Sequence, residues 1–245
     1  MTLPMVEGDR ATIPDSWLQG RTAYGGASAA IALMAAKAAN KELPPLRSAQ
    51  IAFVGPLAGD VTVTPQLLRR GKNSAFIGVD VAGSNGIGLR ALFLFMAHRE
   101  SSIRHGDLSA RDIPAPEDGV IDGSSIGPGF LANFELAKVG EPTPGNWLRW
   151  VRLKNRSALD PEVELVAIAD ALPPAAMGFA TTWGPISTTT WQLNLIGSIM
   201  TRDGWWLLGA EALHTADGNS SQTMTIWNRN GAAVATATQS VALFV

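Results

Sequence analysis

The chain has 245 residues, of which 46% are hydrophobic, so it is long enough to bury a core as one large domain or two small ones. Its net charge of -2 and its scattered basic residues exclude a nucleic-acid-binding class of protein. The absence of cysteine excludes thiol catalysis, disulfides and zinc-thiolate sites.

The start of the chain shows no targeting signal. The first ten residues, "MTLPMVEGDR", lack the basic, apolar and small-residue regions of a signal peptide. The most apolar stretch, residues 25–36, is too short to cross a bilayer. We therefore expect a cytoplasmic protein without a membrane partner.

Residues 25–39, "GGASAAIALMAAKAA", are the first predicted helix. This segment is apolar on nearly every face, which is typical of a helix buried on all sides. It begins at Gly25 and Gly26, where the backbone can approach another group closely. A tight strand-to-helix turn would explain these two glycines equally well.

Two similar hairpins are predicted, at residues 71–97 and 218–244, each with strands joined by an Asn-Gly turn. When Asn85 is placed on Asn230, apolar positions of the two hairpins coincide as well. Two further strands precede each hairpin, and an apolar helix precedes each set of strands. The sequence therefore predicts a duplicated α+β domain, in which each half wraps a long antiparallel sheet around one buried helix.

The halves are separated by a segment rich in proline and glycine, residues 106–145, which we interpret as a surface linker. The predicted organisation is thus an N-terminal unit over 1–105, the linker over 106–145 and a C-terminal unit over 146–245.

The second predicted helix, residues 161–172, carries an acid in its last turn. Asp170 lies among apolar residues, and two prolines end the helix directly after it. The helix dipole and burial would both raise the pKa of this acid towards the range of a general base. The alternative is a structural carboxylate paired with a core donor such as Arg149, Arg152 or Trp191.

The last predicted strand, "VATATQSVALFV", contains one amide on its apolar face, Gln239. An unpaired buried amide costs about 1 to 3 kcal/mol, so we expect a fixed partner, a ligand or a held water. The alternative is an amide that only bridges strand backbones in the core. On the sequence alone, replacing Gln239 with Leu is expected to keep or slightly raise stability.

The chain resembles the acyl-CoA thioesterases of double hotdog fold, which are related to bacterial thioesterase II. The resemblance rests on "RTAYGG" before the first helix, the repeated strands, the Asp in the second helix and the closing "VATATQS". It implies two tandem hotdog units, an acyl-CoA substrate, and no cofactor or metal beyond the coenzyme A of the substrate. It also implies a role in lipid metabolism.

The resemblance further implies that Asp170, Thr188 and Gln239 hold the attacking water. A thioester can be hydrolysed by direct attack of water, without a Ser or Cys nucleophile. We expect Gly25 or Gly26 to bind the substrate oxyanion through a backbone N–H. Which threonine of "STTT" faces the site stays open: Thr188 fits best, and Thr190, two residues on, is expected on the same face as a substrate contact.

Two alternatives remain on the sequence. "GSSIG" at residues 123–127 matches a nucleophile elbow with Ser125, but no apolar strand precedes it and no helix follows. The second alternative is a hotdog protein that binds an acyl ligand without hydrolysing it. The exposed edges of the predicted sheets are compatible with a homodimer or a higher homo-oligomer.

Overall fold

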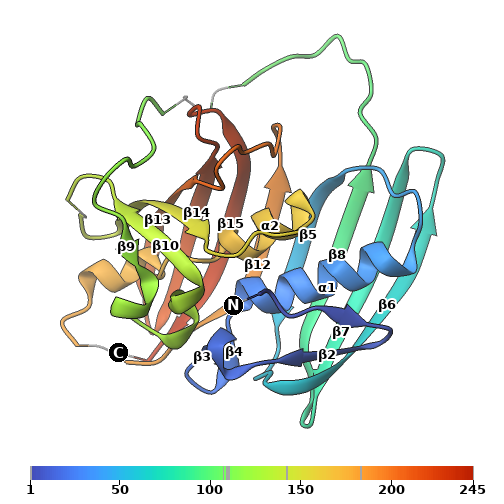
Figure 1. Ribbon diagram of the computed structural model, residues 1–245, viewed down its shortest axis with the longest axis horizontal. Helices are drawn as coiled ribbons and strands as arrows, with labels where there is room; N and C mark the ends of the chain where they lie inside the picture. Colours follow the sequence, from blue (N-terminus) through green and yellow to red (C-terminus); the bar gives the residue numbers. More distant parts are fainter. Residues whose placement is uncertain (1, 107, 109–110, 142, 183, 245) are drawn as a thin grey trace.

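The computed structural model describes residues 2–106, 108, 111–141, 143–182 and 184–244. Within these residues, thirteen strands form one continuous antiparallel sheet, and both α-helices lie on the same face of it (Figure 1). The strands follow in spatial order: β1 (Val6–Glu7), β2 (Arg10–Ile13), β6 (Gly59–Arg70), β7 (Ser74–Gly83), β8 (Gly86–Met96), β5 (Leu46–Phe53), β12 (Ile186–Leu195), β15 (Ala233–Leu243), β14 (Asn219–Trp227), β13 (Trp206–Ala216), β11 (Asn146–Leu153), β10 (Phe134–Lys138) and β9 (Ile121–Asp122).

The sheet consists of two halves that join where β5 pairs with β12. The N-terminal half lies on the right of Figure 1 and the C-terminal half on the left. After β8 the chain arches over the top of the view to reach the second half (Figure 1). The predicted α+β duplication and both Asn-Gly hairpins, β7–β8 and β14–β15, are confirmed.

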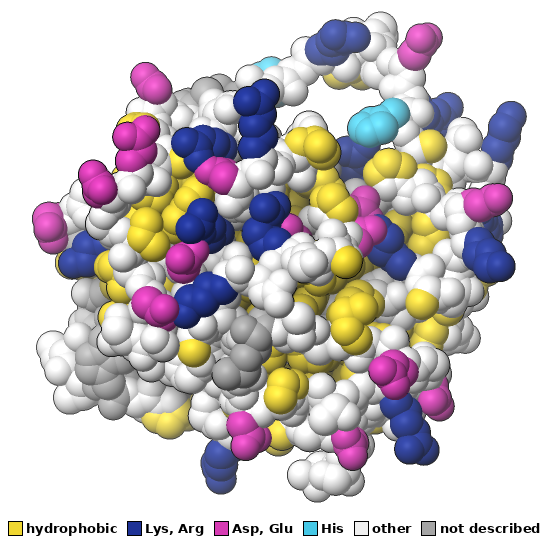
Figure 2. Space-filling view, viewed as in Figure 1, with side chains coloured by type: hydrophobic (Ala, Val, Ile, Leu, Met, Phe, Trp, Pro, Cys, Tyr) yellow, Lys and Arg dark blue, Asp and Glu magenta, His cyan; other side chains and the backbone are white. Residues whose placement is uncertain are grey.

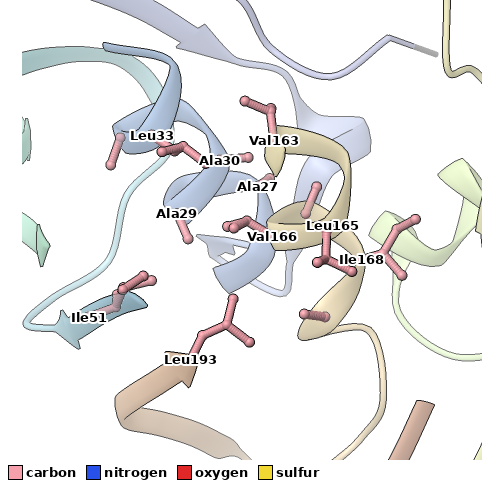
Figure 3. Packing of buried hydrophobic residues seen from close by; sticks show 14 of the residues in the cluster. Ala27, Ala29, Ala30, Leu33, Ile51, Val163, Leu165, Val166, Ile168 and Leu193 are labelled. Atoms are coloured by element: carbon pink, nitrogen blue, oxygen red, sulfur yellow. The ribbon is translucent and has the colours of Figure 1, made fainter. Parts of the chain in front are cut away.

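Helix α1 (Gly25–Ala39) and helix α2 (Pro161–Ala169) pack against each other between the two halves. Alanines let the helix backbones approach, and Figure 3 shows Ala27 and Ala30 of α1 facing Val163 and Val166 of α2. Ile51 of β5 points towards the helices from the central part of the sheet (Figure 3). Both helices are therefore buried on nearly all sides, as their largely apolar sequences predict.

The segment predicted as a linker contains more structure than that interpretation implies. It contributes β9 and β10, together with the 3-10 helices η2 (Gly123–Ser125) and η3 (Gly129–Asn133). β10 pairs with β11 and extends the C-terminal half of the sheet. Its prolines and glycines bound short elements, while Phe130, Phe134 and Leu136 between them are buried in the core.

Smaller elements complete the chain. They are the 3-10 helices η1 (Asp15–Trp17) and η4 (Ala175–Phe179), and a separate hairpin of β3 (Leu18–Gln19) and β4 (Thr22–Ala23). On the face seen in Figure 2, lysine and arginine side chains lie among acidic ones, which agrees with the small net charge. Among the described residues, no helix combines the length and apolar character needed to span a membrane.

Candidate functional site

The candidate site lies where the C-terminal end of α2 meets the N-terminal end of α1. Asp170 is the C-cap residue of α2, and Pro173 and Pro174, beyond Ala171 and Leu172, prevent the helix from continuing. Tyr24, the N-cap residue of α1, donates a hydrogen bond from its hydroxyl to the carbonyl of Ala167, at 2.7 Å. The two helix ends are thereby joined across 143 residues of sequence.

Two glycines allow this junction to close. A Cβ atom added to Gly25 would lie 2.5 Å from Oδ2 of Asp170 and 3.0 Å from the Phe53 ring. A Cβ atom added to Gly26 would overlap the carbonyl oxygen of Ala167 and the Tyr24 hydroxyl. Both glycines are therefore required for close approach of the backbone to Asp170 and α2, and not only for a turn.

The first N–H groups of α1 point to this junction. The N–H groups of Ala27 and Ser28 bond the carbonyl of Tyr24, and the backbone of Gly26 hydrogen-bonds the Asp170 carboxylate. Within the described part of the chain, the N–H of Gly25 makes no hydrogen bond. An unsatisfied N–H at a helix N-terminus is a suitable donor to a negatively charged oxygen.

Gln239 contacts Asp170 directly. Its Nε2 donates to Oδ1 of Asp170 at 2.6 Å, and its Oε1 accepts a hydrogen bond from Nε2 of Gln222 at 2.6 Å. Oε1 of Gln222 in turn accepts from the backbone N–H of Ala175 at 2.8 Å. The buried amide of the last strand therefore has fixed partners on both sides, and one of them is the acid of α2.

The environment of Asp170 changes its acidity. Burial raises the pKa of Asp170 to about 7, although hydrogen bonds from Gln239 and the backbone of Gly26 act in the opposite direction. The carboxyl group is surrounded by protein, yet the residue keeps some exposed surface. A carboxylate of this kind can accept a proton at neutral pH.

The threonines of β12 divide between the two faces of the sheet. Thr188 is half-buried and lies opposite the buried Val241. Within the described residues, no hydrogen bond joins its side chain to Asp170 or Gln239. Thr190 is exposed opposite Ser240, so the expectation that it shares the face of Thr188 is wrong. A β-bulge at Thr189 shifts the register between them and reverses the alternation.

A groove of about 870 Å³ lies on the outer face of the sheet, around the junction of β5 and β12. Thr190 and Gln192 line it together with the outward side chains of neighbouring strands, including the Asp80–Arg90 ion pair. Asp170 lies on the opposite, helix-bearing side of the sheet. The structure thus separates the Thr190 side chain from Asp170, while Gln239 borders the groove and directs its amide to Asp170.

Ser125 does not lie on a strand-to-helix nucleophile elbow. It ends the short helix η2 on the surface, where its hydroxyl donates to the carbonyl of Asp122 at 2.7 Å. His214, the histidine downstream of the Ser125 motif that a serine hydrolase would need, is an exposed residue of β13. Among the described residues, no group of three or more histidine, aspartate and glutamate side chains is placed to hold a metal ion.

Sequence reasoning missed Gln222 and Tyr24. Gln222 is a buried amide on the inner face of β14. The same search for a polar residue on the inward face of a strand that identified Gln239 would have found it. Tyr24 carries no such signal, because a tyrosine before a helix is unremarkable without its contacts. Its ring stacks on Phe130 of η3, at a centroid distance of 4.2 Å, so the predicted linker supports the site.

Solved structures share this fold along nearly the full chain. They include a hotdog-fold protein of unknown function from Alicyclobacillus acidocaldarius, which is 18% identical in sequence. The match covers 99% of the present chain and 96% of that protein, with a TM-score of 0.87. A protein named as a thioesterase II from Thermobifida fusca has 17% identity, 98% and 94% coverage and a TM-score of 0.81. A protein named as a thioesterase from Novosphingobium aromaticivorans has 22% identity, full coverage of both chains and a TM-score of 0.73.

At these identities the structural similarity establishes the fold alone, which is the predicted double hotdog. No curated protein sequence matches the chain. Family comparison is more specific: the acyl-CoA thioesterase N-terminal domain matches residues 13–96, and the acyl-CoA thioesterase C-terminal domain matches residues 107–243. The chain therefore belongs to the acyl-CoA thioesterase family.

Proposed function

We propose that this protein hydrolyses an acyl-CoA to a free acid and coenzyme A by direct attack of water, with Asp170 as the general base. The observation that carries the proposal is the buried carboxylate, which Gln239 holds against the start of α1. The pKa of about 7 of this carboxyl group suits a base that works at neutral pH.

The proposed chemistry needs no covalent intermediate. Water attacks the thioester carbonyl carbon while Asp170 takes one of its protons, and the carbonyl oxygen becomes an oxyanion. Collapse of the tetrahedral intermediate expels the coenzyme A thiolate, which receives the proton from Asp170. Water and thioester are thereby converted into acid and thiol, and the base is regenerated.

Gly25 is the proposed oxyanion donor. Its N–H makes no hydrogen bond among the described residues, and it lies at the positive end of the α1 dipole, beside Oδ2 of Asp170. Gly26 has a different proposed role, because its backbone bonds the Asp170 carboxylate and so holds the base.

Thr188 is the proposed third contact to the water. Its half-buried side chain lies opposite Val241, two residues beyond Gln239 on the same face of β15. Thr188→Val keeps a β-branched strand residue but removes the hydroxyl, so turnover should fall about 10-fold. Thr238→Val, on the outer face of β15, is the matched control and should leave turnover unchanged.

The function is tested by incubating the protein with acyl-CoAs of several chain lengths and a thiol-reactive dye. Thiol release at a rate proportional to protein concentration, and lost in Asp170→Asn, is the expected result. Retention of acyl-CoA without thiol release would contradict hydrolysis and would support a non-catalytic acyl-CoA-binding protein. Thiol release that persists unchanged in Asp170→Asn would contradict the role of Asp170.

A further inference from the structure

A chain of three hydrogen bonds ends on Asp170. It starts at the backbone N–H of Ala175, passes through the amides of Gln222 and Gln239, and reaches Oδ1 of Asp170, with lengths of 2.8, 2.6 and 2.6 Å. Gln222 and Gln239 are both buried, with 1% and 5% of their surfaces exposed. Water therefore has little access to compete for these amide groups.

The direction of this chain is fixed at its backbone end. A backbone N–H can only donate, so the atom of Gln222 that faces Ala175 must be its oxygen. The Gln222 nitrogen then faces Gln239 and requires the oxygen of Gln239 as its acceptor. The Gln239 nitrogen is left to face Asp170, whose Oδ1 must therefore accept and carry no proton.

We infer that Gln222 is a positioning residue, which orients the Gln239 amide so that Asp170 uses Oδ1 as a permanent acceptor and Oδ2 as the oxygen that takes the proton. This inference rests on the proposed function, in which Asp170 is the base. Oδ2 is the oxygen beside Gly25, the proposed oxyanion donor. The proton acceptor and the oxyanion donor thus lie next to each other at the start of α1.

Few other charges influence this carboxylate. Tyr24 is the titratable side chain that faces Asp170 from the start of α1, and burial raises its pKa further above the neutral range, so it stays uncharged. The remaining groups that affect the acidity of Asp170 are the Gln239 amide and the backbone of Gly26. A change in the Asp170 titration on replacing Gln222 by an uncharged residue would therefore report the direction of the Gln239 amide.

The fold itself does not require amides at these positions. In the N-terminal half, Ile77 pairs with Phe93 in the register in which Gln222 pairs with Gln239. Ile77 and Phe93 are fully buried, so an apolar pair packs well at this place in a hotdog sheet. Gln222→Ile is accordingly a replacement that the strand geometry tolerates.

The decisive measurement is the titration of Asp170 by carboxyl ¹³C NMR, with the signal identified by its loss in Asp170→Asn. In Gln222→Ile the Gln239 amide is free to turn its oxygen to Asp170, which favours the protonated acid. In Gln222→Glu the new carboxylate accepts from Ala175 and from Gln239, which turns the Gln239 oxygen to Asp170, and its negative charge raises the pKa of Asp170 as well. Both variants should raise the midpoint pH of the Asp170 titration by at least about one unit and lower kcat by about 10-fold.

Gln192→Ile is the matched control, because Gln192 lies on the outer face of β12 and should affect neither quantity. An Asp170 midpoint that stays at its wild-type value in folded Gln222→Ile or Gln222→Glu overturns the inference, whatever happens to turnover. A shifted midpoint in a protein whose wild type releases no thiol would support the positioning role and contradict the proposed function. The two failures are therefore distinguishable.

Discussion

The two junctions between α1 and α2 occupy equivalent places in the duplicated fold but differ in chemistry. At one junction, Gly25 starts α1 beside Asp170 with an N–H that bonds no other described residue. At the other junction, Pro161 starts α2 without any N–H, and the side chain of Asp160 already caps the helix. Among the described residues, the first N–H groups of α2 are therefore already bonded to Asp160 and are not available to a ligand.

The second junction is filled by ion pairs. Lys37, near the C-terminal end of α1, bonds Asp160 at 2.6 Å and Glu162 at 2.7 Å. Glu162 also accepts the backbone N–H of Leu46, at 2.7 Å. The polar groups here satisfy one another, as expected of groups that stabilise the fold.

The strands that face the helices differ between the two halves in the same way. Ile77 and Gln222 each precede the Asn of their hairpin by eight residues, yet one is apolar and the other is an amide. Their partners, Phe93 and Gln239, differ in the same way. The comparison teaches that duplication supplied two equivalent positions, and that the polar side chains which could support chemistry are gathered at only one of them.

Removing the acid is the strongest way to test this asymmetry. Asp170→Asn should lower thioesterase turnover by at least about 100-fold, because the base is lost, while circular dichroism stays native. A variant that unfolds, while the folded fraction keeps normal turnover, would make Asp170 a structural residue.

A second test adds a methyl group at the reactive junction. Gly25→Ala should lower kcat by about 10- to 100-fold, because its Cβ would displace Oδ2 of Asp170. The control is Gly106→Ala, since a Cβ there meets nothing within 4 Å. Normal turnover in a folded Gly25→Ala variant would show that the close approach is not needed for the reaction.

The pH dependence of activity and stability tests the raised pKa of Asp170. Because Asp170 must be ionised to act, kcat/KM should rise about tenfold per pH unit below its pKa of about 7 and level off above it. A raised acid pKa means that the native state binds more protons than the unfolded state between pH 4 and 7, approximately. Asp170 thus destabilises the fold increasingly as pH rises through this window.

Asp170→Asn removes that penalty, so its free energy of unfolding relative to wild type should increase from pH 4 to pH 8, as measured by urea denaturation. An unchanged difference across this range, or a kcat/KM plateau that extends to pH 5, would show that the pKa of Asp170 is not raised.

Replacing the paired amides Gln222 and Gln239 tests how much they contribute to the stability of the fold. Gln239→Leu leaves the buried Gln222 nitrogen without its acceptor, so it should cost about 1 to 3 kcal/mol, contrary to the expectation from sequence. Adding Gln222→Ile creates an apolar pair like Ile77–Phe93 and should recover part of that loss. Strictly additive effects in denaturant unfolding would argue against coupling between the two amides.

The smallest effect on activity is expected at the ion-paired junction. Burial alone would lower the pKa of Lys37, but its bonds to Asp160 and Glu162 outweigh burial and raise it. The resulting stabilisation is present at neutral pH and is lost as pH rises through the raised pKa of Lys37. Lys37→Met should therefore lower stability at pH 7 by roughly 1 to 2 kcal/mol and leave kcat unchanged. A large loss of kcat at full stability would contradict the structural role of this junction.

The sequence by itself determined the elements of this protein. The largely apolar segments at 25–39 and 161–169 form buried helices, and the Asn-Gly turns fix both hairpins. Alternation along the last strand placed Gln239 on the inner face, and an acid among apolar residues identified Asp170. These properties follow from local periodicity, which reports the side of an element that is buried.

Only the tertiary structure decided which buried groups meet. Gly25 and Asp170 are far apart in sequence and come together because α1 and α2 pack side by side in antiparallel directions. The bulge at Thr189 reverses the face of Thr190, which no repeating pattern predicts. The direction of the amides depends on one backbone N–H, that of Ala175. Periodicity cannot encode such contacts, because each depends on the relative placement of elements from distant parts of the chain.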